Sequence, residues 1–170
     1  MAFEIVTKSA GINQACFKIT HGLYILTAKN EKFNGQCIDA VMQVTNMPPR
    51  LSIGIGKRSL TSEMIAKNGQ FVINVIDRDD PNKMDVVKHF GFQSGRKVDK
   101  FADLPFETGE LGLPILPDAK AYFECKVIDE MSVDLDTHML YTASIISAGV
   151  SEDGVPFTYT EYRDIKFKGG

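Results

Sequence analysis

The apolar stretches of the chain are short, rich in strand-forming residues and separated by glycine, proline and asparagine. Residues 23–27, 51–55 and 70–76 are of this kind, and residues 122–127 alternate between apolar and polar side chains. Such runs predict β-strands, and no β-α-β alternation at helical lengths connects them. The pattern favours an antiparallel barrel, mainly β with peripheral helices, over a doubly wound parallel sheet.

Turn signals divide the remaining strand segments. Asn34-Gly35 predicts a tight turn, followed by a strand over residues 37–45. The two prolines at positions 48 and 49 should end that strand, because proline cannot donate to a ladder. Residues 140–150 predict a long strand and residues 157–162 a last short one.

Three short helices are expected outside the strands. Residues 12–19 are amphipathic and should end at Gly22, and residues 64–67 should end at Asn68-Gly69. Asp80-Pro81 supplies an N-cap and a first-turn proline for a helix that reaches about Phe90 and is stopped by glycine.

Length, composition and charge exclude several classes of protein. The 170 residues suit a single domain over residues 1–170, since one domain is typically about 150 residues long. Apolar residues make up 44% of the chain and charged residues 24%, which excludes a disordered protein. The 19 basic and 22 acidic residues give a net charge of −3, and no basic stripe is present. We therefore expect no nucleic-acid partner.

The cysteines and the termini bear on the cellular compartment. Cys16, Cys37 and Cys125 are widely spaced and lack a C-x-x-C pair, which argues against a disulfide framework or a structural metal site. The N-terminus lacks a secretory signal, and no apolar run approaches the ~20 residues of a membrane helix. These features predict a cytoplasmic protein with reduced thiols and no membrane partner.

Residues 54–61 form the first candidate binding segment. The segment joins a strand to a helix and offers two glycines, Lys57, Arg58 and the hydroxyls of Ser59 and Thr61. Cations and hydroxyls at a helix N-terminus suit an anionic phosphate, although the segment is neither a Walker A loop nor a G-x-G-x-x-G motif. The alternative is a solvated turn before a capped helix.

Two further polar segments have local alternatives of the same kind. Residues 94–101 contain Arg96, Lys97 and Lys100, and by themselves they could form a polar surface loop. Asp134, Asp136 and His138 alternate and would share one face of a strand, but without a second histidine nearby they are a weak metal site. We expect no metal ion.

These segments together resemble the flavin reductase-like family, whose fold is the FMN-binding split barrel. The similarity is greatest to the branch of flavoredoxins and the flavin domain of high-molecular-weight rubredoxins. It covers nearly the whole chain, roughly residues 15–166, in the family's order. The matching motifs are at residues 18–24, 34–35, 43–45 with 48–49, 60–63, 91–101, 112–114, 137–138 and 158–159 with Tyr162.

The resemblance implies an antiparallel, Greek-key-like split β-barrel and a homodimer that binds FMN near the subunit interface. The flavin ring would lie against the strand after Asn34-Gly35 and the stretch before the double proline. Asp39 stands where the family commonly has asparagine. The residues that this nominates for the ring are Thr27, Gln36, Cys37, Ile38, Asp39, Gln43, Val44 and Thr45.

The resemblance also implies where the phosphate and the electron donor would lie. The phosphate would lie toward Lys57, Ser59 and Thr61. His138 matches a histidine on the flavin or nicotinamide side. A second set of flavin or phosphate contacts would come from Ser94, Arg96 and Lys100.

The implied activity is that of an NAD(P)H-dependent flavin reductase, which passes electrons from NADH or NADPH to flavin or another acceptor. The alternative is a flavoredoxin-like electron-transfer protein with tightly bound FMN and a redox-protein partner. A third possibility is a barrel that has lost flavin and serves as a binding module. Because flavin carries the hydride chemistry, we assign no catalytic side chain.

Overall fold

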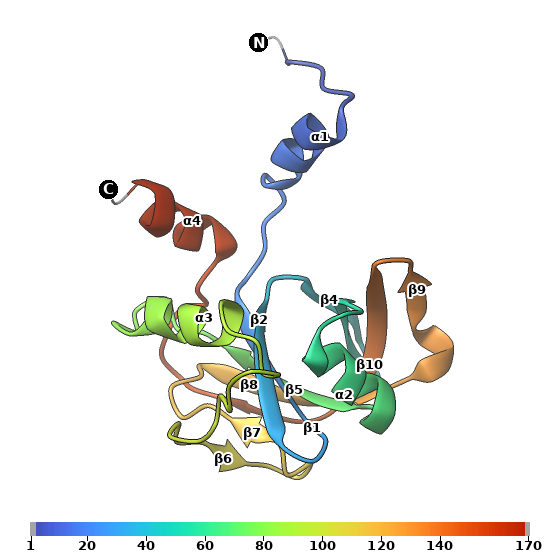
Figure 1. Cartoon of the computed structure of the whole chain (residues 1–170), viewed down its shortest axis with the longest axis vertical. Helices are drawn as coiled ribbons and strands as arrows, with labels where there is room; N and C mark the ends of the chain where they lie inside the picture. The colour runs from blue at the N-terminus through green and yellow to red at the C-terminus, as the bar shows by residue number, and fades with distance from the viewer. Residues whose placement is uncertain (1–2, 169–170) are drawn as a thin grey trace.

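The computed structural model describes residues 3–168 and is built on an antiparallel eight-stranded sheet (Figure 1). The strands follow the order β2-β1-β5-β8-β10-β4-β3, and β9 pairs with β10. β6 (Glu107–Thr108) and β7 (Pro114–Ile115) form a separate two-stranded sheet. The other strands are β1 (Tyr24–Lys29), β2 (Phe33–Ile38), β3 (Val41–Asn46), β4 (Pro49–Gly56), β5 (Gln70–Val75), β8 (Ala121–Val127), β9 (Val133–Leu135) and β10 (His138–Val150).

Helices lie around this sheet, as expected. α2 (Leu60–Asn68) packs against β1 and β2, and α3 (Lys83–Gly91) lies beside β2. α1 (Ser9–Cys16) projects from the barrel and buries none of its residues, whereas α4 (Tyr159–Lys168) buries Tyr162 (Figure 1). A short 3-10 helix, η1 (Asp129–Met131), precedes β9.

Two main hydrophobic clusters hold these elements together. The first fills the barrel and includes Leu26, Ile53 and Phe71, together with Ile65 from α2. The second lies under α3 and the C-terminal segment and includes Phe90 and Phe157. α2 and α3 both contact β2. The N-terminus of α2 and the C-terminus of α3 therefore lie close to each other.

The predicted turn at Asn34-Gly35 is wrong, because both residues lie inside β2. The chain reverses instead at Asn30–Lys32, where the Asn30 N–H donates to the Lys32 carbonyl. Asn34 is buried and bonds to α2, and Gly35 lies against Phe90 so closely that a Cβ would be 2.6 Å from its ring. The pair serves close packing rather than a turn.

The predicted strand over residues 37–45 is two strands. β2 ends at Ile38 and β3 begins at Val41, because the chain bends at Asp39-Ala40. The two strands are the ends of the sheet order, so the barrel is split at this link. The double proline ends β3 as expected, and Pro49 then pairs with Asn46 as the first residue of β4.

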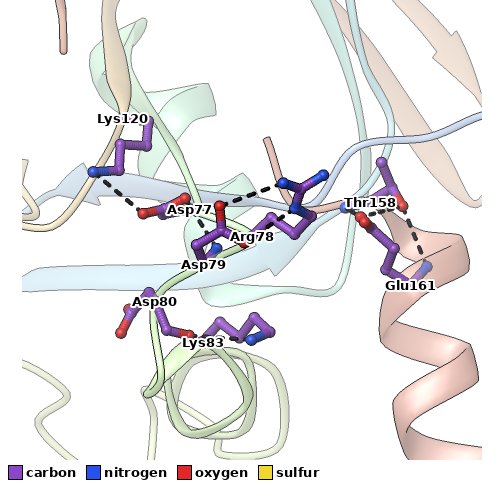
Figure 2. A network of polar contacts seen from close by, with 8 residues as sticks. All are labelled: Asp77, Arg78, Asp79, Asp80, Lys83, Lys120, Thr158 and Glu161. Atoms are coloured by element: carbon purple, nitrogen blue, oxygen red, sulfur yellow. Dashed lines mark hydrogen bonds and ion pairs between the residues drawn. The ribbon is translucent and has the colours of Figure 1, made fainter. Parts of the chain in front are cut away.

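The predicted strand over residues 157–162 is also wrong, since α4 begins at Tyr159. Thr158 and Glu161 form a capping box. The Glu161 N–H donates to Thr158 Oγ1 (3.2 Å), and the Glu161 carboxylate accepts from the Thr158 N–H (2.9 Å; Figure 2). This reciprocal pair satisfies N–H groups that a strand would have used in a ladder.

The first predicted helix is also shifted. α1 covers Ser9–Cys16 rather than residues 12–19, and Gly22 pairs with Thr158 instead of capping a helix. α2 is longer than predicted but ends as expected at Gly69, whose φ of 63° is left-handed.

Polar contacts hold the turn that follows β5 (Figure 2). Asp77 is buried, accepts from the Asp79 N–H (3.0 Å) and pairs with Lys120 (3.2 Å). The hydrogen bond from Asp79 and the Lys120 ammonium hold the pKa of Asp77 below its usual value, against the effect of burial. The turn that leads into α3 is therefore fixed by a charged carboxylate.

Candidate functional site

A cavity of about 220 Å³ opens where three segments meet. β2 forms one wall, the loop from β4 into α2 forms the second, and the segment that follows α3 forms the third. These segments carry the motifs that the sequence singled out separately. The residues that line the cavity are Asn34, Gly35, Gln36, Cys37, Arg58, Ser59, Leu60, Thr61, Phe90, Gly91, Gln93, Ser94, Gly95, Arg96 and Lys100.

The wall at α2 is a capped helix N-terminus. Ser59 has extended backbone, and its Oγ accepts from the Ser62 N–H (3.1 Å), which is the geometry of an N-cap. Thr61 is buried in the first turn, where its Oγ1 accepts from Asn34 Nδ2 (2.9 Å). The helix N-terminus is therefore tied to β2 and directs its positive end toward the cavity.

The segment after α3 is fixed to β2 by lysines. Lys100 is buried, and its Nζ donates to the carbonyls of Gly35 (2.7 Å) and Phe90 (2.9 Å). Lys32 Nζ donates to the Gly95 carbonyl (2.7 Å). Gly95 allows this close approach, since a Cβ there would overlap the Asn34 side chain. Residues 94–101 therefore form a structured wall of the cavity. They are not the polar surface loop that was the alternative prediction.

The cavity is strongly cationic. Arg58, Arg96 and Lys100 line it, and Arg96 pairs with Glu63 at its edge. Burial lowers the pKa of Lys100 to about 8, and an anion beside it would raise that value. Burial and the nearby Asp39 together raise the pKa of Cys37 to about 12, although Lys100 acts in the opposite direction, so Cys37 is a neutral thiol.

The structure brings together a large part of the predicted site. The glutamine and cysteine of β2 meet the hydroxyls of the α2 N-terminus and the polar residues after α3. These residues come from three motifs that are far apart in the sequence. They are Gln36, Cys37, Ser59, Thr61, Ser94, Arg96 and Lys100.

Lys57 and Thr27 lie outside this cavity. Lys57 turns to the β9–β10 hairpin and pairs with Asp134 (2.6 Å). Thr27 is fully buried, and its Oγ1 donates to the Pro114 carbonyl (2.6 Å) in the small second sheet. Neither side chain is placed to contact a phosphate in the cavity.

The other residues nominated for the ring lie along the split. Ile38 is part of the barrel core, and Asp39 is half-buried on the link to β3. On β3, Gln43 Nε2 donates to Asn46 Oδ1 (3.0 Å) and Thr45 Oγ1 to the Pro48 carbonyl, and Val44 is exposed. Gln43 also lines a second hollow of about 420 Å³ beside Tyr24 and Phe123.

His138 is exposed at the start of β10, opposite Gly56, and its Nδ1 is bonded to Thr137 Oγ1 (2.9 Å). Asp134 and His138 lie on different strands, and Asp136, with a φ of 61°, is in the turn between them. They therefore do not share the face of one strand. Within residues 3–168, no group of three histidine, cysteine, aspartate or glutamate side chains is placed to hold a metal ion.

Sequence reasoning missed three polar side chains that line the cavity, those of Asn34, Arg58 and Gln93. Arg58 is a cation in the loop before α2, but the family resemblance implied its neighbour Lys57 as the phosphate contact. Asn34 was interpreted as a turn residue, so its side chain was not considered as part of a site. Gln93 lies within the matching motif at residues 91–101, and its position just after α3 places it at the cavity. Separately, no helix among residues 3–168 is long and apolar enough to cross a membrane.

Comparison with known proteins identifies the family of the chain. A model of the flavin reductase like domain matches residues 16–166. The chain belongs to the flavin reductase-like family. It is therefore a flavin-binding oxidoreductase with the split-barrel fold, and the resemblance drawn from its motifs is confirmed.

Individual relatives agree with the family assignment. The chain is 39% identical over 155 residues to a high molecular weight rubredoxin of Moorella thermoacetica, with 90% of this chain and 66% of the relative covered. It is 31% identical to a ferric-chelate reductase (NAD(P)H) of Archaeoglobus fulgidus, with 90% and 89% covered. A flavoredoxin structure from Methanosarcina acetivorans superposes with a TM-score of 0.75 at 27% identity, with 89% and 77% covered.

Proposed function

We propose that the protein binds FMN with its phosphate in the 220 Å³ cavity and works as an NAD(P)H-dependent flavin reductase. The observation that carries this proposal is the convergence of Arg58, Arg96 and Lys100 on the N-terminus of α2. Cationic donors, the hydroxyls of Ser59 and Thr61 and a positive helix end are the groups that a phosphate monoester needs. FMN fits this set because its phosphate is terminal and carries up to two charges.

The chain's own residues would bind and orient the flavin. Lys100 already holds β2 and the end of α3 in place through two carbonyls, so the cavity is formed before a ligand arrives. Gln36 and Cys37 extend from the cavity toward the split, where Asp39 follows. Thr27 and Lys57 would not contact the flavin directly. The ring would lie against residues along the split, which are Ile38, Asp39, Gln43, Val44, Thr45 and His138.

Bound flavin would supply the hydride and electron chemistry, for which the protein provides position and electrostatics. The proposed donor is NADH or NADPH, and the acceptor is free flavin, oxygen or iron. The name of the Archaeoglobus relative, an NAD(P)H ferric-chelate reductase, supports this donor.

Arg58 and Lys57 offer a matched test of the phosphate site. Arg58→Ala should weaken FMN binding about tenfold, which corresponds to ~1.4 kcal/mol for an exposed charge-assisted contact. Lys57→Ala, one residue away but paired with Asp134, should change FMN affinity little. Titration of flavin-free protein followed by flavin fluorescence measures both. Equal weakening of FMN and riboflavin by Arg58→Ala would mean that Arg58 supports the loop and not the phosphate.

A second function is favoured by the similarity to a high molecular weight rubredoxin and a flavoredoxin. In this alternative, FMN stays bound and electrons pass to a redox-protein partner. Anaerobic stopped-flow mixing with NADH and NADPH separates the two. Rapid bleaching of the flavin by either nucleotide supports the reductase. No reduction by either nucleotide, with reduction by dithionite, would favour the carrier.

We further propose a homodimer that works in the cytoplasm. The exposed apolar side chains of Met42 and Val44 on edge strand β3, and of Met47 directly after it, support a subunit interface at the split. The cysteines at 16, 37 and 125 are free thiols, which suits a reducing compartment.

A further inference from the structure

An ion pair spans the edge of the cationic cavity. Arg96, from the segment after α3, reaches α2, where its Nη2 donates to Glu63 Oε1 (2.5 Å). The same nitrogen donates to the Arg58 carbonyl (3.4 Å) in the loop before α2. One guanidinium therefore connects two of the three walls.

The pair is exposed enough to exchange partners. The exposed fractions of the Arg96 and Glu63 side chains are 47% and 53%, and pairs of this kind stabilise a protein little. A guanidinium carries five N–H donors. Within residues 3–168, both side-chain hydrogen bonds that Arg96 donates come from Nη2.

A ligand phosphate would compete with Glu63. Phosphate and carboxylate are both recognised by the planar fork of a guanidinium, so the two anions need the same group. Glu63 also adds a negative charge beside the cavity, which opposes the approach of a dianion. Its hydrogen bond and charge raise the pKa of Arg96, so the guanidinium is charged in both states.

We infer that Glu63 is a specificity-determining residue that holds Arg96 across the edge of the cavity and yields it to the phosphate of the incoming flavin. This inference rests on the proposed function. Glu63 then lowers the affinity for the phosphate-bearing flavin and leaves the affinity for riboflavin unchanged. The protein thereby binds FMN less tightly than its cations would allow, which suits a flavin that exchanges between turnovers.

Glu63→Gln tests this role, because glutamine keeps the size of the side chain and removes its charge. FMN should bind the variant about two- to fivefold more tightly, the range that an exposed ion pair is worth. Riboflavin should bind as to the wild type. Asp164→Asn is the matched control, since Asp164 is a half-exposed carboxylate paired with Lys168 on α4, away from the cavity. It should change neither affinity.

The same titrations with Arg96→Ala complete the test. In that background Glu63→Gln should lose most of its gain, because there is no guanidinium to release. Weaker FMN binding by Glu63→Gln would show that Glu63 positions Arg96 for the phosphate and would overturn the inference. Unchanged FMN binding, or parallel changes for FMN and riboflavin, would overturn it as well. If wild-type protein binds no FMN, the proposed function itself fails.

Discussion

At the scale of single residues, Lys100 connects the stability of the cavity with its charge. Its ammonium is buried against two backbone carbonyls, and burial lowers its pKa to about 8. A bound phosphate would favour the charged form and raise this pKa. Below pH 8 Lys100 is charged with or without ligand, whereas above pH 8 the free protein must take up a proton to bind FMN.

The expected result is an FMN affinity that is constant below about pH 8 and falls above it, by up to about tenfold per pH unit while one proton is linked to binding. Lys100→Met should remove this slope. Titrations with FMN between pH 6.5 and about pH 9.5 measure it. A wild-type affinity that stays constant over this range would mean that Lys100 does not sense the phosphate.

Local geometry also explains why Arg58, and not the predicted Lys57, lines the cavity. The two residues lie in the turn between β4 and α2, which the Ser59 N–H closes by donating to the Gly56 carbonyl (3.1 Å), and only Arg58 lines the cavity. Lys57 faces the β9–β10 hairpin, where Asp134 holds it. The sequence showed two cations but not the face that each one takes.

At the scale of elements, the capping box of α4 decided between a helix and a strand. Thr158 and Glu161 are joined by three hydrogen bonds at the first turn, and Thr158 also pairs with Gly22 at the start of the barrel. The cap therefore fixes both the start of α4 and its attachment to the strands.

Thr158→Ala should lower the free energy of unfolding by about 1 kcal/mol, as is typical for the loss of an N-cap hydroxyl. Thr160→Ala is the matched control, because Thr160 is exposed within the same turn, and it should be neutral or slightly stabilising. Urea denaturation of the three proteins measures the difference. Equal stability of Thr158→Ala and Thr160→Ala would mean that tertiary packing alone holds α4.

At the scale of the whole molecule, the split between β2 and β3 leaves β3 as an edge strand with exposed apolar side chains. The exposed fractions of Met42 and Val44 on β3 are 61% and 39%, and that of Met47, directly after β3, is 94%. Such an edge favours association with another chain. The proposed homodimer would cover it and bring the predicted ring residues of β3 into the interface.

Charges placed on β3 test this interface. Met42→Lys combined with Val44→Lys should yield a folded monomer at micromolar concentration, as measured by light scattering. Leu135→Lys places one lysine on β9, which also pairs with a neighbour on one side only, and should leave the dimer intact. Dissociation by Leu135→Lys and not by the β3 variant would move the interface to the β9–β10 hairpin.

The sequence by itself determined the antiparallel strand class, the end of α2 at Gly69 and the family, because short apolar runs and turn residues act locally and the motifs occur in a fixed order. Only the tertiary structure decided where side chains point. Asn34 packs inside β2 because Thr61, 27 residues later, accepts its hydrogen bond. Lys100 enters the cavity because its acceptors include Gly35, 65 residues earlier. Contacts between segments so far apart leave no local pattern, so the cavity appears only when the barrel brings its three walls together.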